Sequence, residues 1–238
     1  MSFALRSFNV TVPQAPPGLK AIPVRTGLVR PDDDLIALIR AATAGIAQRG
    51  DVVAVSESAV AIAQGEFLAA EHVRPSRLAY ALSRRTGALA TVNQPESMQL
   101  VIDRVGTWRV VYATVAHTIA RAAGRRGKFY ELMGDAVTAF DGYTGTLPPY
   151  ERAIVFAPRD SDGFAQLFYE RTGVACAVVD ANDLGKAKVL GATAGVRRDL
   201  VEAALLENPH GNSDEQTPVV VIKWRGAGSN PLLRAGAA

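Results

Sequence analysis

Three oxygen-bearing side chains, Asp180, Asn182 and Asp183, are the residues of this chain best suited to chemistry. They follow the apolar, β-branched run 174–179 (VACAVV), which predicts a buried strand. Carboxylate and amide oxygens are ligands that Mg²⁺ and Mn²⁺ prefer, with waters and phosphates completing the shell. Lys186, just beyond, could neutralise a phosphate. The pattern favours a metal or phosphate site and, equally, an Asx-rich turn that satisfies its own backbone.

A second candidate lies in the segment 134–150, which is rich in Gly, Thr and Pro and has little periodicity. We expect a long loop, and loops of this length often carry function. Asp141 stands beside Gly142, whose lack of a side chain lets a ligand approach closely. Thr144 and Thr146 add hydroxyl groups. An ordinary turn is the alternative explanation for these residues.

A third candidate is the polar group Ser56, Glu57 and Ser58, which follows the predicted buried strand 51–55. We expect residues 56–65 to continue this strand or to form the turn beyond it. A turn whose polar groups bond to one another is again the competing explanation.

Common catalytic motifs are absent from the sequence: it contains no P-loop, no G-x-G-x-x-G after a strand, no H-E-x-x-H and no cysteine pair. Cys176 is the single cysteine, so it predicts a small buried side chain and excludes a disulfide within the chain. The segment 191–195 (GATAG) has the outline of a nucleophile elbow, but a tight turn before a helix is favoured. His117 and His210 are expected on the surface and in a loop.

Composition indicates a soluble, cytoplasmic protein. The chain has 238 residues, about half of them apolar, and a net charge of only +3. No apolar run approaches the length of a membrane span, and the first twenty residues lack the apolar core of a signal peptide. The one basic cluster, at 121–128, is expected at the end of a helix. We therefore predict neither a nucleic-acid nor a membrane partner.

The alternation of elements predicts an α+β or mixed α/β fold over residues 1–238, as one large domain or two small interlocked ones. Strands are predicted at 21–28, 51–55, 100–103, 153–156, 174–179 and 218–223, and helices at 32–50, 74–87, 108–124, 160–171 and 196–206. In the helix 108–124 the apolar residues recur at helical spacing, so we expect this stripe to face the core and His117, opposite it, to face solvent. The tail 226–238 is expected to be frayed and flexible.

Three segments, in order, resemble the coenzyme F(420)-0:gamma-glutamyl ligase family (CofE-like proteins and the N-terminal part of FbiB). They read IPVRTGLVRPDDDLIALI, GDVVAVSESAVAIAQG and APRDSDGFAQLFYERTGVACAVVDANDLG. The resemblance implies a CofE-like fold with two intertwined subdomains and a homodimer. It also implies a ligase that uses GTP (or ATP) with Mg²⁺ or Mn²⁺. This ligase would join L-glutamate, through an acyl phosphate, to a carboxylate of a deazaflavin coenzyme precursor.

The resemblance also assigns metal-binding residues. The Asp of the family's G-I-D motif falls on Asp141, and the Asp of its S-D-T-F-G motif falls on Asn182, with Asp183 at the Thr position. Asp180 lies close enough to take part through a shifted turn. The implied metal ligands are therefore Asp141, Asp180, Asn182 and Asp183, with the catalytic roles at Asp141 and Asp183.

Nucleotide contacts are implied at Leu28, Ser56, Ser58 and Lys186. Here the chain departs from the family: Ser58 and Ile62 stand where phosphate-contacting lysines are typical, and the G-I-D-x-S-N motif is replaced by FDGYTG. Other cations would have to substitute, with Arg25, Arg30 and Lys128 as candidates. Otherwise the chain is a divergent ligand-binding or scaffold protein, or an amide ligase for another substrate.

Overall fold

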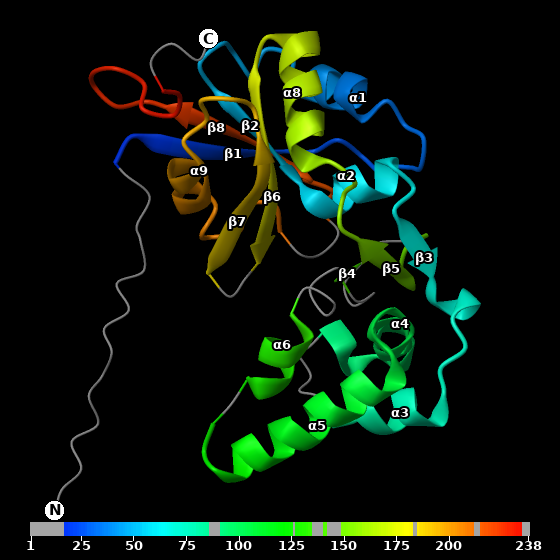
Figure 1. Cartoon of the computed structure of the whole chain (residues 1–238). Helices are drawn as coiled ribbons and strands as arrows, with labels where there is room; N and C mark the ends of the chain where they lie inside the picture. Colours follow the sequence, from blue (N-terminus) through cyan, green and yellow to red (C-terminus); the bar gives the residue numbers. More distant parts are fainter. Residues whose placement is uncertain are drawn as a thin grey trace, which may run out of the picture. The chain divides into compact units, whose positions relative to one another are not determined.

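The computed structural model describes residues 17–85, 91–125, 127–134, 140–141, 149–182, 185–211 and 215–234 (Figure 1). The chain forms two compact units. The first comprises the residues up to 28, 34–57 and those from 160 onward, and the second comprises 29–33 and 58–159. The chain thus enters the second unit twice and returns each time. The predicted mixed α/β class is confirmed.

The first unit is built on a five-stranded mixed sheet with the strand order β1-β8-β2-β6-β7. Its strands are β1 (Leu19–Val24), β2 (Val52–Ser56), β6 (Ala175–Asn182), β7 (Lys186–Ala192) and β8 (Val219–Trp224). β2 and β6 pair in parallel, whereas the β1–β8, β2–β8 and β6–β7 pairs are antiparallel. β1, β2 and β6 therefore run in the same direction, and their carboxyl ends lie at one edge of the sheet.

Helices cover both faces of this sheet, as Figure 1 shows. α1 (Leu35–Ala42) and α8 (Ser161–Thr172) lie on one face, where Ile39 and Phe168 are fully buried. α9 (Arg198–Ala204) lies on the other, where it joins a cluster that includes Val52, Ala54, Ala177, Val179, Val201, Val220 and Ile222. Because both faces are covered, β2 reads as a continuous apolar run rather than an alternating one.

Strand β7 is absent from the sequence prediction. Its residue Gly191 passes so close to the start of α8 that a Cβ atom there would lie 2.2 Å from the backbone carbon of Ser161 and 2.4 Å from the backbone nitrogen of Asp162. Only glycine allows this approach. The first two residues of the GATAG segment therefore end a strand packed on a helix. The predicted tight turn is confirmed at Ala194 and Gly195, just before α9.

Thr193 stands at the nucleophile position of that motif. Its hydroxyl is hydrogen-bonded to two backbone groups. It donates to the carbonyl of Ala165 at 2.9 Å and accepts from the N–H of Cys176 at 3.0 Å, and the residue is buried. Thr193 thus joins α8 to β6 and has no free hydroxyl for catalysis. Cys176 is fully buried, as predicted, and burial raises the pKa of its thiol well above the usual range.

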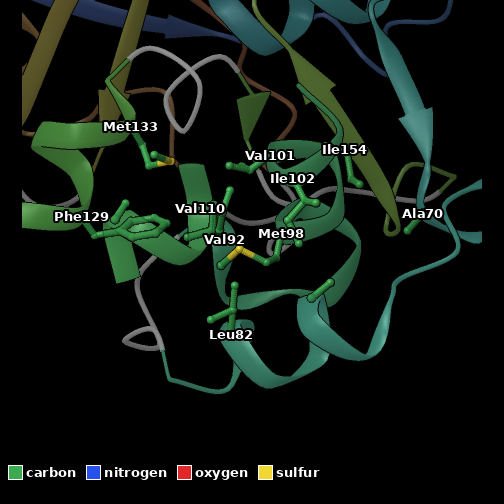
Figure 2. Packing of buried hydrophobic residues seen from close by; sticks show 12 residues of the cluster. Ala70, Leu82, Val92, Met98, Val101, Ile102, Val110, Phe129, Met133 and Ile154 are labelled. Carbon is green, nitrogen blue, oxygen red and sulfur yellow. The ribbon is translucent and has the colours of Figure 1, made fainter. Parts of the chain in front are cut away.

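The second unit combines a small antiparallel sheet with helices. The sheet has the order β3-β5-β4 and consists of β3 (Phe67–Ala69), β4 (Phe140–Asp141) and β5 (Ala153–Phe156). The helices are α2 (Glu57–Ala63), α3 (Arg77–Ser83), α4 (Pro95–Val105), α5 (Thr107–Ala122) and α6 (Lys128–Met133), with 3₁₀ turns at Ala70–His72 and Thr91–Asn93. Figure 2 shows the core between them, in which Met98, Val101, Val110 and Ile154 are fully or almost fully buried.

Two predicted elements in this unit are wrong. Residues 57–63 form the helix α2 and neither continue the strand nor form a turn, and the buried residues of α2 are Ala59, Val60, Ala61 and Ile62. Residues 100–103 lie inside α4 rather than in a strand. Pro95 at the first turn and Gly106 at the end frame an eleven-residue helix, and its buried residues follow helical spacing. Residues 100–103 by themselves resemble a short strand, but Val101 and Ile102 belong to the helical spacing of the longer element.

Helix α5 presents the face opposite to the predicted one. Its buried residues are Val110 and Ala113, while the apolar stripe faces solvent: Trp108 is 85% exposed, Tyr112 66%, Val115 53% and Ile119 66%. His117, expected on the surface, is half-buried, and its Nδ1 accepts the N–H of Phe129 at 3.4 Å. Periodicity therefore identified the helix and its stripe, but assigned the stripe to the wrong side.

Residues 226–234 do not form the frayed tail predicted from Gly226. Leu232 is fully buried, and its carbonyl accepts the N–H of Arg197 at 2.9 Å. Arg234 donates its N–H to the carbonyl of Gly195, and Leu233 forms an isolated bridge with Val196. This segment is thus part of the first unit, because it supplies an apolar side chain to the cluster around α9. Residues 235–238 lie outside the described part of the chain.

His210 lies in a loop, as predicted, and its side chain is buried there. Its Nδ1 lies 3.2 Å from the carbonyl oxygen of Thr217, and the hydroxyl of Thr217 donates back to the carbonyl of His210. Because burial disfavours the charged imidazolium, the pKa of His210 falls from 6.5 to about 4.

This histidine predicts an acid-sensitive fold. The unfolded chain takes up a proton at His210 below about pH 6.5, but the folded chain does so only near pH 4. The neutral-pH stability is therefore lost as the pH falls through this interval, by about 3 kcal/mol in total. Urea unfolding at several pH values measures this loss. His210→Gln should flatten the dependence, whereas the exposed His72→Gln should not; equal slopes in the two variants would contradict the assignment.

Candidate nucleotide and metal site

The predicted site residues of the first unit gather at the edge where β1, β2 and β6 end. Val24, the last residue of β1, pairs with Val219 of β8, which in turn pairs with Val55 of β2. Ser56 then pairs with Val179 of β6, one residue before Asp180. In sheets of this kind, ligands bind outside the carboxyl ends of parallel strands. The register therefore places Ser56 and Asp180 on adjacent strands at an edge suited to binding.

Ser56 is fixed at this edge by its backbone. Its N–H donates to the carbonyl of Pro218 at 2.8 Å, which ties the end of β2 to the start of β8. In the same way, the N–H of Thr26 donates to the carbonyl of Gln216 at 3.1 Å and holds the segment after β1 at this edge. The exposed Arg25 lies between Val24 and Thr26. A cation is thus available beside the strand ends.

Asp180 is the predicted metal ligand whose side chain the structure describes. It lies within β6, not in a turn beyond it, and it pairs with Lys188 of β7. The side chain is exposed, yet protein atoms around the carboxyl displace enough water to raise its pKa, and the positive charge of Lys188 only partly opposes this shift. A carboxylate that is partly desolvated and lacks a dominant cation is suited to receive one.

The other predicted metal ligands are described only in part. Asn182 ends β6, and its backbone pairs with Lys186 across the β6–β7 hairpin. Asp183 lies outside the described residues. Asp141 belongs to the second unit, where β4 pairs it with Val155 of β5. Among the residues that are described, His, Cys, Asp and Glu form no group of three or more that could hold a metal ion.

The predicted nucleotide-binding residues are divided between the units. Leu28, Ser56 and Lys186 belong to the first unit and Ser58 to the second. Lys186 is exposed at the start of β7, whereas Leu28 and Ser58 are half-buried. Ile62, one turn after Ser58 in α2, is buried, with 9% of its surface exposed. The side chain at that position is apolar and supplies no cation for a phosphate.

Of the substitute cations suggested by the sequence, Arg25 is the one that the first unit holds at the strand ends. Arg30 and Lys128 belong to the second unit, and Lys128 pairs with Glu131 at 2.6 Å. Sequence reasoning missed Lys188. The signal was present, because in the run KAKVLGA the two lysines alternate with small residues as in a half-exposed strand. This edge therefore presents Lys188 opposite the partly desolvated Asp180, Lys186 at the start of the same strand β7, and Arg25 after β1, three strands away from β6.

In mixed α/β proteins of this class, ligands usually bind at the carboxyl ends of the strands, where this chain has polar and cationic groups. The family model described as F420-0:Gamma-glutamyl ligase matches residues 23–179, well over half of the chain, so the chain belongs to this family. The matched range includes Leu28, Ser56, Ser58 and Asp141 and ends one residue before Asp180. No curated protein matches the chain. In the described part, no helix is long and apolar enough to cross a membrane.

Proposed function

We propose that this protein is a metal- and nucleotide-dependent amide ligase that couples L-glutamate to a carboxylate of a deazaflavin coenzyme precursor, with GTP or ATP as co-substrate. Family membership over residues 23–179 carries this proposal. The sheet edge supports it, because Asp180 provides a carboxylate while Arg25, Lys186 and Lys188 provide cations. The family resemblance also implies a homodimer.

The chemistry of the edge fits a divalent cation. Asp180, together with Asn182 and Asp183, would supply hard oxygen ligands, and the family resemblance assigns a further ligand role to Asp141. A bound Mg²⁺ or Mn²⁺ would neutralise charge on a triphosphate and on the transferring phosphoryl group. The exposed cations would hold the remaining phosphate oxygens. Lys186 stands where the family typically has arginine, so it would act as a point charge without the bidentate fork.

A second candidate function is ligand binding without ligase activity, or ligation of a different substrate. One observation favours it: α2 carries the half-buried Ser58 and the buried Ile62 at the two positions where phosphate-contacting lysines are typical. Two missing cations weaken the binding of a triphosphate, because desolvated phosphate charge is costly when unpaired. The two functions differ in nucleotide turnover, not in fold.

Thermal unfolding with nucleotide and metal tests the site. Mg²⁺ or Mn²⁺ with GTP or ATP should raise the melting temperature, because a ligand at one hundred times its Kd stabilises the folded state by about 2.7 kcal/mol. We expect a rise of several degrees for a chain of this size. The double variant Asp180→Ala, Asp183→Ala should lose it. Glu170→Ala, which removes an exposed carboxylate of α8, serves as the matched control and should keep it.

The absence of any rise at millimolar nucleotide and metal, with folded protein, would reject the ligase proposal. Phosphate release that requires both glutamate and an acceptor carboxylate would then separate the two functions. Binding with no turnover in the presence of the deazaflavin precursor would favour the ligand-binding protein. Turnover with another acceptor would identify a ligase of different specificity.

A further inference from the structure

Helix α5 has apolar side chains on two opposite faces. Val110 and Ala113 are fully buried in the core of the second unit, whereas Trp108, Tyr112, Val115 and Ile119 form an exposed row, here called the α5 row. A helix that is apolar on both sides is normally covered on both sides. Exposed apolar patches of this kind usually mark a binding surface.

We propose that two copies of this protein associate through α5, with the α5 row of one copy packed antiparallel against the α5 row of the second. This proposal takes the homodimer from the proposed function and names a surface for it. The nucleotide chemistry is not involved.

The spacing of the row is the first argument for a second copy. Its residues are separated by four, three and four positions, so the pattern is the same when read in either direction. A twofold axis between Tyr112 and Val115 therefore places Trp108 opposite the second copy's Ile119, and Tyr112 opposite the second copy's Val115. Each large aromatic side chain meets a smaller branched one. A twofold interface requires such a self-complementary surface.

The charge of the helix is the second argument. The row contains no charged residue, and α5 as a whole carries only two, Arg109 and Arg121. In the antiparallel arrangement Arg109 lies opposite the second copy's Thr118, so like charges do not meet. A helix that binds an anionic membrane has a polar face rich in Lys and Arg, and a nucleic-acid surface needs cations along the backbone. The depletion of charge instead matches the centre of a protein interface.

The area of the row is the third argument. Covering Trp108, Tyr112, Val115 and Ile119 at their observed exposure removes about 500 Å² per copy. A stable interface of standard size buries about 800 Å² per partner. The four side chains thus supply more than half of the required area.

The helix presents the row on a fixed support. The hydroxyl of Thr114 donates to the carbonyl of Val110, and Arg109 donates to the carbonyl of Leu132 at the end of α6. Val110 and Phe129 hold α5 and α6 in one core, as Figure 2 shows. A surface that is already ordered loses little conformational entropy on association.

Sedimentation equilibrium of the full chain without nucleotide tests the proposal. The double variant Trp108→Glu, Ile119→Glu should raise the dimer dissociation constant by about 100-fold or more, since both substitutions occur on both copies. Both side chains are exposed, so the variant should unfold at the wild-type temperature. The matched control is Tyr80→Glu, which changes an exposed aromatic residue of α3, 45% accessible, and should leave the constant unchanged.

Cross-linking locates the contact independently of stability. Val115→Cys places a thiol near the twofold axis, and the native Cys176 is fully buried and does not compete. Mild oxidation should give a disulfide-linked dimer, whereas Tyr80→Cys should remain monomeric on a denaturing gel.

Loss of the dimer in the Glu variant, together with the Val115→Cys cross-link, supports the proposal. A dimer that persists in the Glu variant and gives no cross-link overturns the α5 interface and leaves the homodimer itself standing. A wild-type chain that is monomeric at every concentration overturns both. A monomer that binds phosphatidylserine vesicles would assign the row to a membrane surface and would also overturn the proposal.

Discussion

Gly191→Ala should destabilise the first unit by about 4 kcal/mol, because the new methyl group would collide with backbone and not with a movable side chain. A Cβ at this position lies 2.2 Å from the backbone carbon of Ser161 and 2.4 Å from the backbone nitrogen of Asp162. Relief requires α8 to move away from β7, which opens the core around Phe168. Effects of this size are exceptional for one methyl group. Urea unfolding followed by circular dichroism measures the loss.

Gly45→Ala is the matched control for this substitution. Gly45 has a φ of +76°, and a Cβ there would meet no atom within 4 Å. Its cost is therefore only that of a left-handed conformation, about 1 kcal/mol. If the two variants unfold at the same urea concentration, the close approach of β7 to α8 is not a constraint on the fold.

Lys223→Met should destabilise the first unit by about 3–5 kcal/mol, because it leaves the buried carboxylate of Asp51 without its cation. The Nζ atom of Lys223 lies 2.6 Å from Asp51, and the two side chains are only 9% and 12% exposed. Asp51 also accepts the N–H of Gln48 at 2.8 Å, so it links the start of β2 to the turn before it. The loss is measured by the midpoint of urea unfolding.

The double variant Lys223→Met, Asp51→Asn tests whether the loss of stability comes from the unpaired charge of Asp51. It removes both charges and keeps an acceptor for Gln48, so it should recover most of the lost stability. Arg197→Met breaks an ion pair with Asp199 at the surface and should leave the midpoint unchanged. A Lys223→Met variant as stable as the wild type would show that Asp51 finds compensation elsewhere.

The main strands of the first unit could be predicted because burial on both faces leaves a strong local signal. The apolar runs before Ser56 and Asp180 are examples. β7 could not be predicted, because exposed lysines and a glycine give no local signal for a strand. Only the pairing with β6 and the close approach of α8 explain these residues. Strand propensity depends on such neighbours.

The face of α5 shows a different limit of sequence reasoning. Periodicity gave the helix and its apolar row, but an apolar row indicates burial without stating against what. His117, placed on the opposite side, was therefore assigned to solvent although it contacts the backbone of Phe129. A surface that is covered in an assembly and a surface that is covered in the core have the same sequence pattern.

For the candidate site, the sequence predicted which residue types could bind a metal or phosphate, but not how these residues are arranged on the strands. Asp180 was identified from its position after an apolar run, and the parallel pairing of β2 with β6 explains why it lies near Ser56. Lys188 was missed because its position opposite Asp180 depends on the register of the β6–β7 hairpin. A register between strands is set by long-range packing and not by local spacing.

The path of the chain has a consequence for the order of folding. β2 and β6 are neighbours in the sheet, but the whole long segment of the second unit separates them in sequence. Closing so long a loop costs conformational entropy before the stabilising contacts of the sheet have formed, so such non-local pairings slow folding. During synthesis, β2 cannot form its pairings with β6 and β8 until both strands have left the ribosome. Until then its apolar residues stay unpaired. Early folding of the inserted unit, with its helices around Met98, would shorten this loop. The ends of β2 and β6 would then be closer together, and the sheet would form at a lower entropic cost.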